Sequence, residues 1–266
     1  MVEKFEPLVS AAWLAQHLED PNLRVIDFRW RYDHETGQGQ SARPEYEAGH
    51  IPGAAFVDLE DDVTGHQPGL GRHPLPTDPV FEQAMRAAGL SADSRVVVYD
   101  DAAGFSAARL WWLLRYFGHG AVAVLDGGLQ TWPGPLSRSY EPIARGSFIA
   151  DPQPNMKLDY EEVRERPGSA LLLDARRLER YLGLSEPVEA RSGHIPGARS
   201  AHWGANLGLP GGRLYPASWS DWAGRERVDR FSASLPFIGI TLPITPNLLK
   251  WSPLDSRGAH APMAEA

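Results

Sequence analysis

The sequence predicts an α/β fold made of two copies of one unit, each a mostly parallel sheet flanked by helices, with the second copy incomplete. The hexapeptide Gly-His-Ile-Pro-Gly-Ala occurs at residues 49–54 and again at 193–198. An apolar run upstream of each hexapeptide ends in an acid, Asp27 or Asp174. The hexapeptide histidines are 194 − 50 = 144 residues apart and the acids 174 − 27 = 147, so chance is a poor explanation.

Helical and β-branched patterns alternate along the first copy. The expected elements are, in order, a helix at 11–18, a strand at 23–27, a helix at 77–88, a strand at 95–100, a helix at 107–117 and a strand at 121–125. Ser10 can cap the first helix, Pro79 suits the first turn of the second, and Gly118 ends the third. This alternation predicts a parallel sheet covered by helices on both faces.

The second copy repeats the opening, with a helical pattern at 158–163, but not the middle. Gly53 and Trp132 of the first copy are 79 residues apart, whereas Gly197 and the equivalent Trp222 are 25 apart. The second copy is therefore 79 − 25 = 54 residues shorter. The missing part would hold a helix, the central strand, its loop and most of the following helix.

These comparisons divide the chain into four parts. They are a first domain at 1–145, a linker at 146–157, a truncated second domain at 158–224 and a tail at 225–266. Residues 238–244 of the tail alternate like a strand, but Pro243 interrupts them and further prolines crowd the segment. We expect the tail to be disordered or loosely attached.

Composition excludes several classes of function. The formal net charge is −8, and no run of Lys or Arg offers a basic surface, so nucleic-acid and membrane partners are not expected. The sequence shows neither a signal-peptide pattern nor a long apolar run, so we expect a cytoplasmic protein. We also expect it to be a monomer without a cofactor or a bound metal. The chain contains no cysteine, which removes every thiol-based mechanism.

The repeated motifs resemble the tandem-domain rhodaneses, the thiosulfate and 3-mercaptopyruvate sulfurtransferases, over about residues 6–224. The resemblance rests on the two hexapeptides, Asp-Phe-Arg and Asp-Ala-Arg at the strand ends, Ala-Arg-Leu-Trp-Trp at 108–112, Leu-Asp-Gly-Gly at 125–128 and Arg-Leu-Tyr-Pro-Ala-Ser-Trp-Ser-Asp-Trp at 213–222. It implies two rhodanese-like domains, the first non-catalytic and the second with a cysteine on a loop between the central strand and a helix. It also implies transfer of a sulfane sulfur, through a cysteine persulfide, onto cyanide or a thiol.

The resemblance assigns binding residues but no catalytic residue. Arg180 matches the donor-binding arginine of the family, and the nearby Arg176 is expected to support it in binding a small anionic sulfur donor, thiosulfate or mercaptopyruvate. Val188 stands where the mercaptopyruvate enzymes carry a second arginine, which favours a thiosulfate-type ancestor. The cysteine loop falls in the 54-residue gap (79 − 25), so the sequence predicts a catalytically inactive protein.

Other polar and aromatic residues have structural interpretations. We expect His50 and His194 to be structural residues of the Pro-Gly turns rather than metal ligands or bases. We expect Asp101 to cap the following helix and Arg109 to pair across a domain interface, in preference to a residual anion pocket. The tryptophans at 111–112 are expected to pack in the core or between the domains.

Two alternatives remain open. In the first, the chain is a non-catalytic binding or regulatory module whose intact first domain recognises a partner. In the second, the sequence records a deletion or a shifted reading frame, which would explain both the gap and the unfamiliar tail at 225–266.

Overall fold

The computed structural model describes residues 5–33, 38–67, 71–139, 142–187, 189, 191–201, 214, 216 and 218–225. The predictions for Val188 and for the tail after residue 225 lie outside these ranges. The helices are α1 (Ala11–His17), α2 (Arg43–Ala48), α3 (Asp78–Ala87), α4 (Ala107–Tyr116), η1 (Gly128–Thr131), η2 (Pro154–Met156), α5 (Tyr160–Arg164), α6 (Leu178–Tyr181) and α7 (Ser218–Arg225). The strands are β1 (Leu8–Val9), β2 (Leu23–Asp27), β3 (Trp30–Tyr32), β4 (Gly39–Ser41), β5 (Ala55–Phe56), β6 (Arg95–Tyr99), β7 (Val122–Leu125), β8 (Leu173–Asp174) and β9 (Arg199–Ser200).

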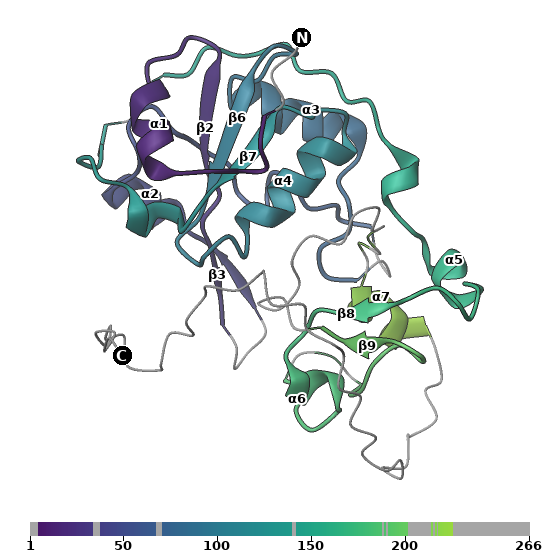
Figure 1. Cartoon of the computed structure of the whole chain (residues 1–266). Coiled ribbons are helices and arrows are strands. Elements are labelled where there is room, and N and C mark those ends of the chain that lie inside the picture. Colours follow the sequence, from purple (N-terminus) through teal and green to yellow (C-terminus); the bar gives the residue numbers. More distant parts are fainter. Residues whose placement is uncertain are drawn as a thin grey trace, which may run out of the picture. The chain divides into compact units, whose positions relative to one another are not determined.

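A parallel five-stranded sheet in the order β1-β7-β6-β2-β5 forms the centre of the first half. In Figure 1, α1 and α2 lie on one side of this sheet and α3 and α4 on the other. The predicted α/β class, with a mostly parallel sheet and flanking helices, is confirmed. No helix among the described residues is long and apolar enough to cross a membrane.

Side chains of the central strand β6 alternate between two hydrophobic clusters, as the pleat of a strand requires. Val96 and Val98 face the larger cluster, which contains the buried residues of α3 and α4. Val97 and Tyr99 face the second cluster, which includes Leu14 of α1. Both faces of β6 are therefore buried in hydrophobic clusters, and the loop that follows it starts from a well-packed strand.

The predicted elements with strong periodicity form as expected. The strand expected at 95–100 is β6, and Ser10 Oγ accepts a hydrogen bond from the backbone N–H of Trp13 at 3.1 Å. The indole ring of Trp111 and that of Trp112 pack against the larger cluster, which confirms their predicted structural role. The sequence analysis missed β1, β5, α2 and the β3–β4 hairpin, because strands of two or three residues and a six-residue helix carry too few apolar positions to show a period.

The segment predicted as a linker begins as part of the first domain. Phe148 is only 3% exposed and belongs to the larger cluster. Its backbone N–H donates to the carbonyl oxygen of Leu90 at 3.0 Å, and its own carbonyl accepts from Arg86 Nε at 2.7 Å. The N–H of Gln153 still bonds to the carbonyl of Tyr116 at 2.7 Å. The chain therefore stays attached to the first domain up to about this residue.

The second half repeats the start of the first on a smaller scale. Asp159 forms a capping box at α5, and β8 pairs with β9 in parallel, with Leu173 opposite Arg199. The first copy has the same pairing between β2 and β5, with Ile26 opposite Ala55. Among the described residues, β2 has a second partner in β6, whereas β8 has β9 alone. The second core is correspondingly small.

Candidate functional site

The loop between β6 and α4 is organised around one buried carboxylate, that of Asp100, which is 1% exposed. Its Oδ1 accepts hydrogen bonds from the backbone N–H groups of Ala102 and Gly104 at 2.9 and 2.8 Å. Its Oδ2 accepts from the N–H groups of Ser106 and Ala107 at 2.8 and 2.9 Å, and from Ser106 Oγ at 3.1 Å. Four backbone donors and one hydroxyl thus converge on a single side chain.

Converging N–H groups at the start of a helix form a cradle that favours an anion. The resemblance places a thiolate and an anionic donor at such a loop in the catalytic copy, whereas in this first copy the protein's own carboxylate occupies the cradle. Ala103 adopts the left-handed region here, at φ 55°, and Gly104 follows at φ 87°. The backbone therefore turns sharply around Asp100 and directs its donors inward.

The predicted cap was wrong by one residue: Asp100, not Asp101, accepts the N–H groups at the start of α4. Asp101 instead forms a bidentate ion pair with Arg31, with distances of 2.8 and 2.7 Å. Arg31 Nε also donates to Glu45 at 2.8 Å. These contacts, first of all the hydrogen bond with Asp101, raise the pKa of Arg31. Asp100, the first residue after β6, lies within reach of the loop N–H groups, whereas the partly exposed Asp101 does not.

A second polar cluster joins Glu60, His73, Trp30 and Arg109. Glu60 Oε1 accepts from Trp30 Nε1 at 3.0 Å and lies 3.0 Å from His73 Nε2, and this contact with His73 is the main cause of the lowered pKa of Glu60. Arg109 Nη2 donates to the carbonyl oxygen of His73 at 2.9 Å, while its buried Nε has no hydrogen-bond partner. Burial lowers the pKa of Arg109 to about 10. Arg109 therefore bonds to the His73 loop of its own domain. The sequence had predicted that it would pair across a domain interface.

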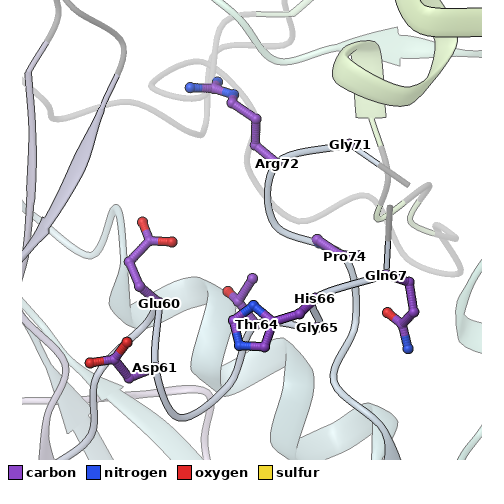
Figure 2. Close-up of a pocket in the computed structure, with 9 residues that line it drawn as sticks. All are labelled: Glu60, Asp61, Thr64, Gly65, His66, Gln67, Gly71, Arg72 and Pro74. Carbon is purple, nitrogen blue, oxygen red and sulfur yellow. The ribbon is translucent and has the colours of Figure 1, made fainter. Parts of the chain in front are cut away.

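The sequence analysis missed this cluster because its members come from a hairpin, two loops and a helix, and no spacing singles out His73. A cavity of about 290 Å³ lies along the same loop. It is lined by Glu60, Asp61, Thr64, Gly65, His66, Gln67, Gly71, Arg72 and Pro74. Figure 2 shows the Arg72 side chain pointing away from His66 and Thr64. With two carboxylates and one arginine in its wall, this cavity does not favour a small anionic donor.

A buried acid and arginine stand at the end of β2. Arg29 Nε and Nη2 bond to the Asp27 carboxylate at 3.0 and 2.6 Å, and Nη2 also donates to the carbonyl of Gly49 at 2.8 Å. The Tyr99 hydroxyl donates to the same carboxylate at 2.7 Å. The two charged side chains are 0% and 5% exposed, so the pair connects the strand end to the hexapeptide turn inside the core.

The second copy repeats this pair. Arg176 Nε and Nη2 bond to Asp174 at 3.0 and 2.7 Å, and Nη2 donates to the carbonyl of Gly193 at 2.6 Å. Arg176, predicted to support donor binding, thus occupies the position of Arg29. The Nε and Nη2 atoms of Arg176 therefore already bond to oxygen atoms of the protein itself.

Replacing Asp27 by asparagine is expected to lower the stability of the first domain by about 2 kcal/mol, because Arg29 loses its buried counter-charge. Hydrogen exchange of the β6 amides measures this loss. The matched control, Asp174→Asn, removes the equivalent charge from the second copy and should leave β6 exchange unchanged. Equal effects of both changes on β6 would contradict the separate roles of the two pairs.

Arg180 lies beside Arg176, and Glu186 connects them. Arg180 Nη2 is 2.6 Å from Glu186 Oε1, and Arg176 Nη1 is 3.3 Å from Glu186 Oε2. The Glu186 side chain is 4% exposed. The structure therefore brings the two predicted binding arginines together at one buried carboxylate.

The hexapeptide histidines have the predicted structural role. His50 Nδ1 lies 2.8 Å from the carbonyl oxygen of Tyr46, and its ring stacks on the Tyr46 ring at 3.9 Å. His194 repeats both contacts with Tyr181, at 2.8 and 3.9 Å. In the described part of the chain, no group of three His, Asp or Glu side chains is arranged to hold a metal ion.

Comparisons with known proteins agree with this duplicated geometry. A model of the rhodanese-like domain matches residues 10–134. A Pseudomonas aeruginosa protein named "Probable 3-mercaptopyruvate sulfurtransferase" is 39% identical over 237 residues, which cover 86% of this chain and 79% of that protein. The chain belongs to the rhodanese family of sulfurtransferases.

Other rhodanese relatives support the same assignment. The 3-mercaptopyruvate sulfurtransferase of Escherichia coli is 37% identical over 207 residues, covering 73% of this chain and 70% of that protein. The crystal structure of SseA from Escherichia coli, a 3-mercaptopyruvate sulfotransferase, superposes with a TM-score of 0.69 and 29% identity, over 80% of this chain and 99% of that one. The predicted family and fold are therefore confirmed.

Proposed function

We propose that this chain is a rhodanese-family sulfurtransferase homologue that binds a small anionic sulfur donor and does not transfer its sulfur. The observation that carries the proposal is the absence of cysteine from all 266 residues. Sulfur transfer in this family needs a thiolate that accepts the sulfane sulfur as a persulfide. A hydroxyl or carboxylate oxygen cannot form that intermediate.

The loop after β6 supports the proposal independently. A persulfide and its donor would need free N–H groups at the strand-to-helix turn. In the first copy these groups already bond to the carboxylate of Asp100. The first domain is therefore suited to a structural role rather than to catalysis.

Donor binding is assigned to Arg180, with Arg176 beside it. Guanidinium groups suit the planar or tetrahedral oxygens of a carboxylate or thiosulfate. The relatives named as mercaptopyruvate sulfurtransferases make a donor of this class the natural ligand, and Val188 favours thiosulfate. That the chain works as a cytoplasmic monomer, and that its second domain has lost 79 − 25 = 54 residues, remain predictions from the sequence.

Turnover assays test the proposal. Purified protein is expected to form no thiocyanate from thiosulfate and cyanide, and no sulfide from 3-mercaptopyruvate and a thiol, above the rate without enzyme. The Escherichia coli 3-mercaptopyruvate sulfurtransferase, assayed in parallel with mercaptopyruvate, is the positive control. A rate that is proportional to the concentration of this chain would overturn the proposal.

A further inference from the structure

The Glu186 carboxylate is the meeting point of both candidate binding arginines. Arg180 donates to it twice, from Nη2 at 2.6 Å and from Nε at 3.2 Å, and Arg176 Nη1 donates at 3.3 Å. The backbone N–H of Glu189 adds a fourth contact at 3.2 Å. Glu186 is the most buried of the three charged side chains, 4% exposed against 14% for Arg176 and 19% for Arg180. Both guanidinium groups thus donate to an anion of the protein itself.

The first copy shows that a cation at the Arg180 position is not required by the fold. Tyr46 and Tyr181 are structurally equivalent, since each stacks on a hexapeptide histidine and donates its hydroxyl to a carbonyl at 2.8 Å. The residue before Tyr181 is Arg180, whereas the residue before Tyr46 is Glu45. An arginine at this position is therefore specific to the second copy, where the donor is proposed to bind.

We propose that Glu186 is a positioning residue that holds Arg180 and Arg176 and, as their internal counter-anion, limits how tightly a small oxyanion binds to them. This inference rests on the proposed function of Arg180 in donor binding. The two guanidinium groups pair with two carboxylates, Asp174 and Glu186, so each positive charge already has a negative partner within the protein. An incoming anion has to compete with Glu186 for the same donors.

Titration of the full chain with thiosulfate, followed by calorimetry, tests the inference. Glu186→Gln keeps the shape of the side chain and removes its charge, and we expect it to bind thiosulfate about tenfold more tightly or better. Arg180→Gln should abolish binding, alone and together with Glu186→Gln. Glu179→Gln removes an exposed charge from α6, the helix that carries Arg180. It should leave the affinity for thiosulfate within about twofold of wild type, since exposed charges are screened.

The outcomes separate the two proposals. If Glu186 had a purely structural role, its substitution would weaken thiosulfate binding by the chain. Unchanged or weaker binding by Glu186→Gln therefore overturns this inference. If Arg180→Gln still loses binding in that case, the proposed function stands. Wild-type affinity in Arg180→Gln overturns both. Should circular dichroism show that Glu186→Gln is unfolded, Glu186→Ala decides: it also removes the carboxylate, so binding tighter than wild type is expected, whereas no gain overturns the inference.

Discussion

Replacing Asp100 by alanine is expected to destabilise the first domain by about 4 kcal/mol or more, the largest effect of any single change considered for this chain. The substitution removes the acceptor of four backbone N–H groups, whereas the Ser106 hydroxyl keeps an acceptor in the carbonyl oxygen of Phe28 at 2.8 Å. Each buried donor left without a partner costs about 1–3 kcal/mol, and water entering the vacated space recovers part of this. Urea unfolding of the wild type and the variant measures the difference.

Asp101→Ala is the matched control for Asp100→Ala. It removes a carboxylate from the adjacent position, but this carboxylate pairs with Arg31 in a partly exposed contact. Such pairs contribute about 1 kcal/mol or less. Asp100→Asn should lie between the two, because one oxygen still accepts while the new amide group faces backbone donors. A loss below about 1 kcal/mol for Asp100→Ala would show that the loop does not depend on its carboxylate.

Limited proteolysis is expected to remove the second half of the chain first and to leave a resistant first domain that ends after residue 153. Among the described residues of the second half, the buried cluster consists of Tyr160, Val163, Ile195, Ala198, Trp222 and Ala223. Leu172, which stands 147 residues after Val25 just as Asp174 stands 147 residues after Asp27, is only partly buried, whereas Val25 of β2 is buried. A strand paired on one edge, with little apolar area buried, opens at a low free-energy cost.

Mass spectrometry of the early fragments identifies the first cuts. The attachment of Phe148 and Gln153 to the first domain predicts that cleavage spares the chain up to about residue 153. A Phe148→Ala variant should extend cleavage into this segment, because its anchor in the larger cluster is gone. First cuts within the β2–β7 region, or equal resistance of both halves, would contradict a marginal second domain.

The parts of the fold that could be predicted are those in which side-chain period and burial agree. The Val-Val-Val run of β6, buried on both faces, and the long amphipathic pattern of α4 leave little choice of conformation. Strand β1 and the β3–β4 hairpin depend on pairing with distant residues, as when Leu8 lies opposite Val124. No local pattern encodes such pairing.

The duplication identified the repeated part of the candidate site, and the family resemblance identified Arg180. The two Asp-x-Arg strand ends and the two histidines stand in the same contacts in both copies, so the duplication itself identified them. The choice of Asp100 over Asp101 as the acceptor depends on the direction of the loop, which only the three-dimensional structure shows. The same holds for Glu186, whose role follows from its distance to two arginines that precede it by six and ten residues.

The absence of persulfide chemistry is most directly tested by intact-protein mass spectrometry after incubation with excess thiosulfate or 3-mercaptopyruvate. The mass of the chain is expected to stay unchanged, since no thiol is present to accept a sulfur atom. The Escherichia coli 3-mercaptopyruvate sulfurtransferase, treated with 3-mercaptopyruvate in the same way, serves as the positive control. A gain of one sulfur atom by this chain, reversed by a reducing thiol, would contradict the account.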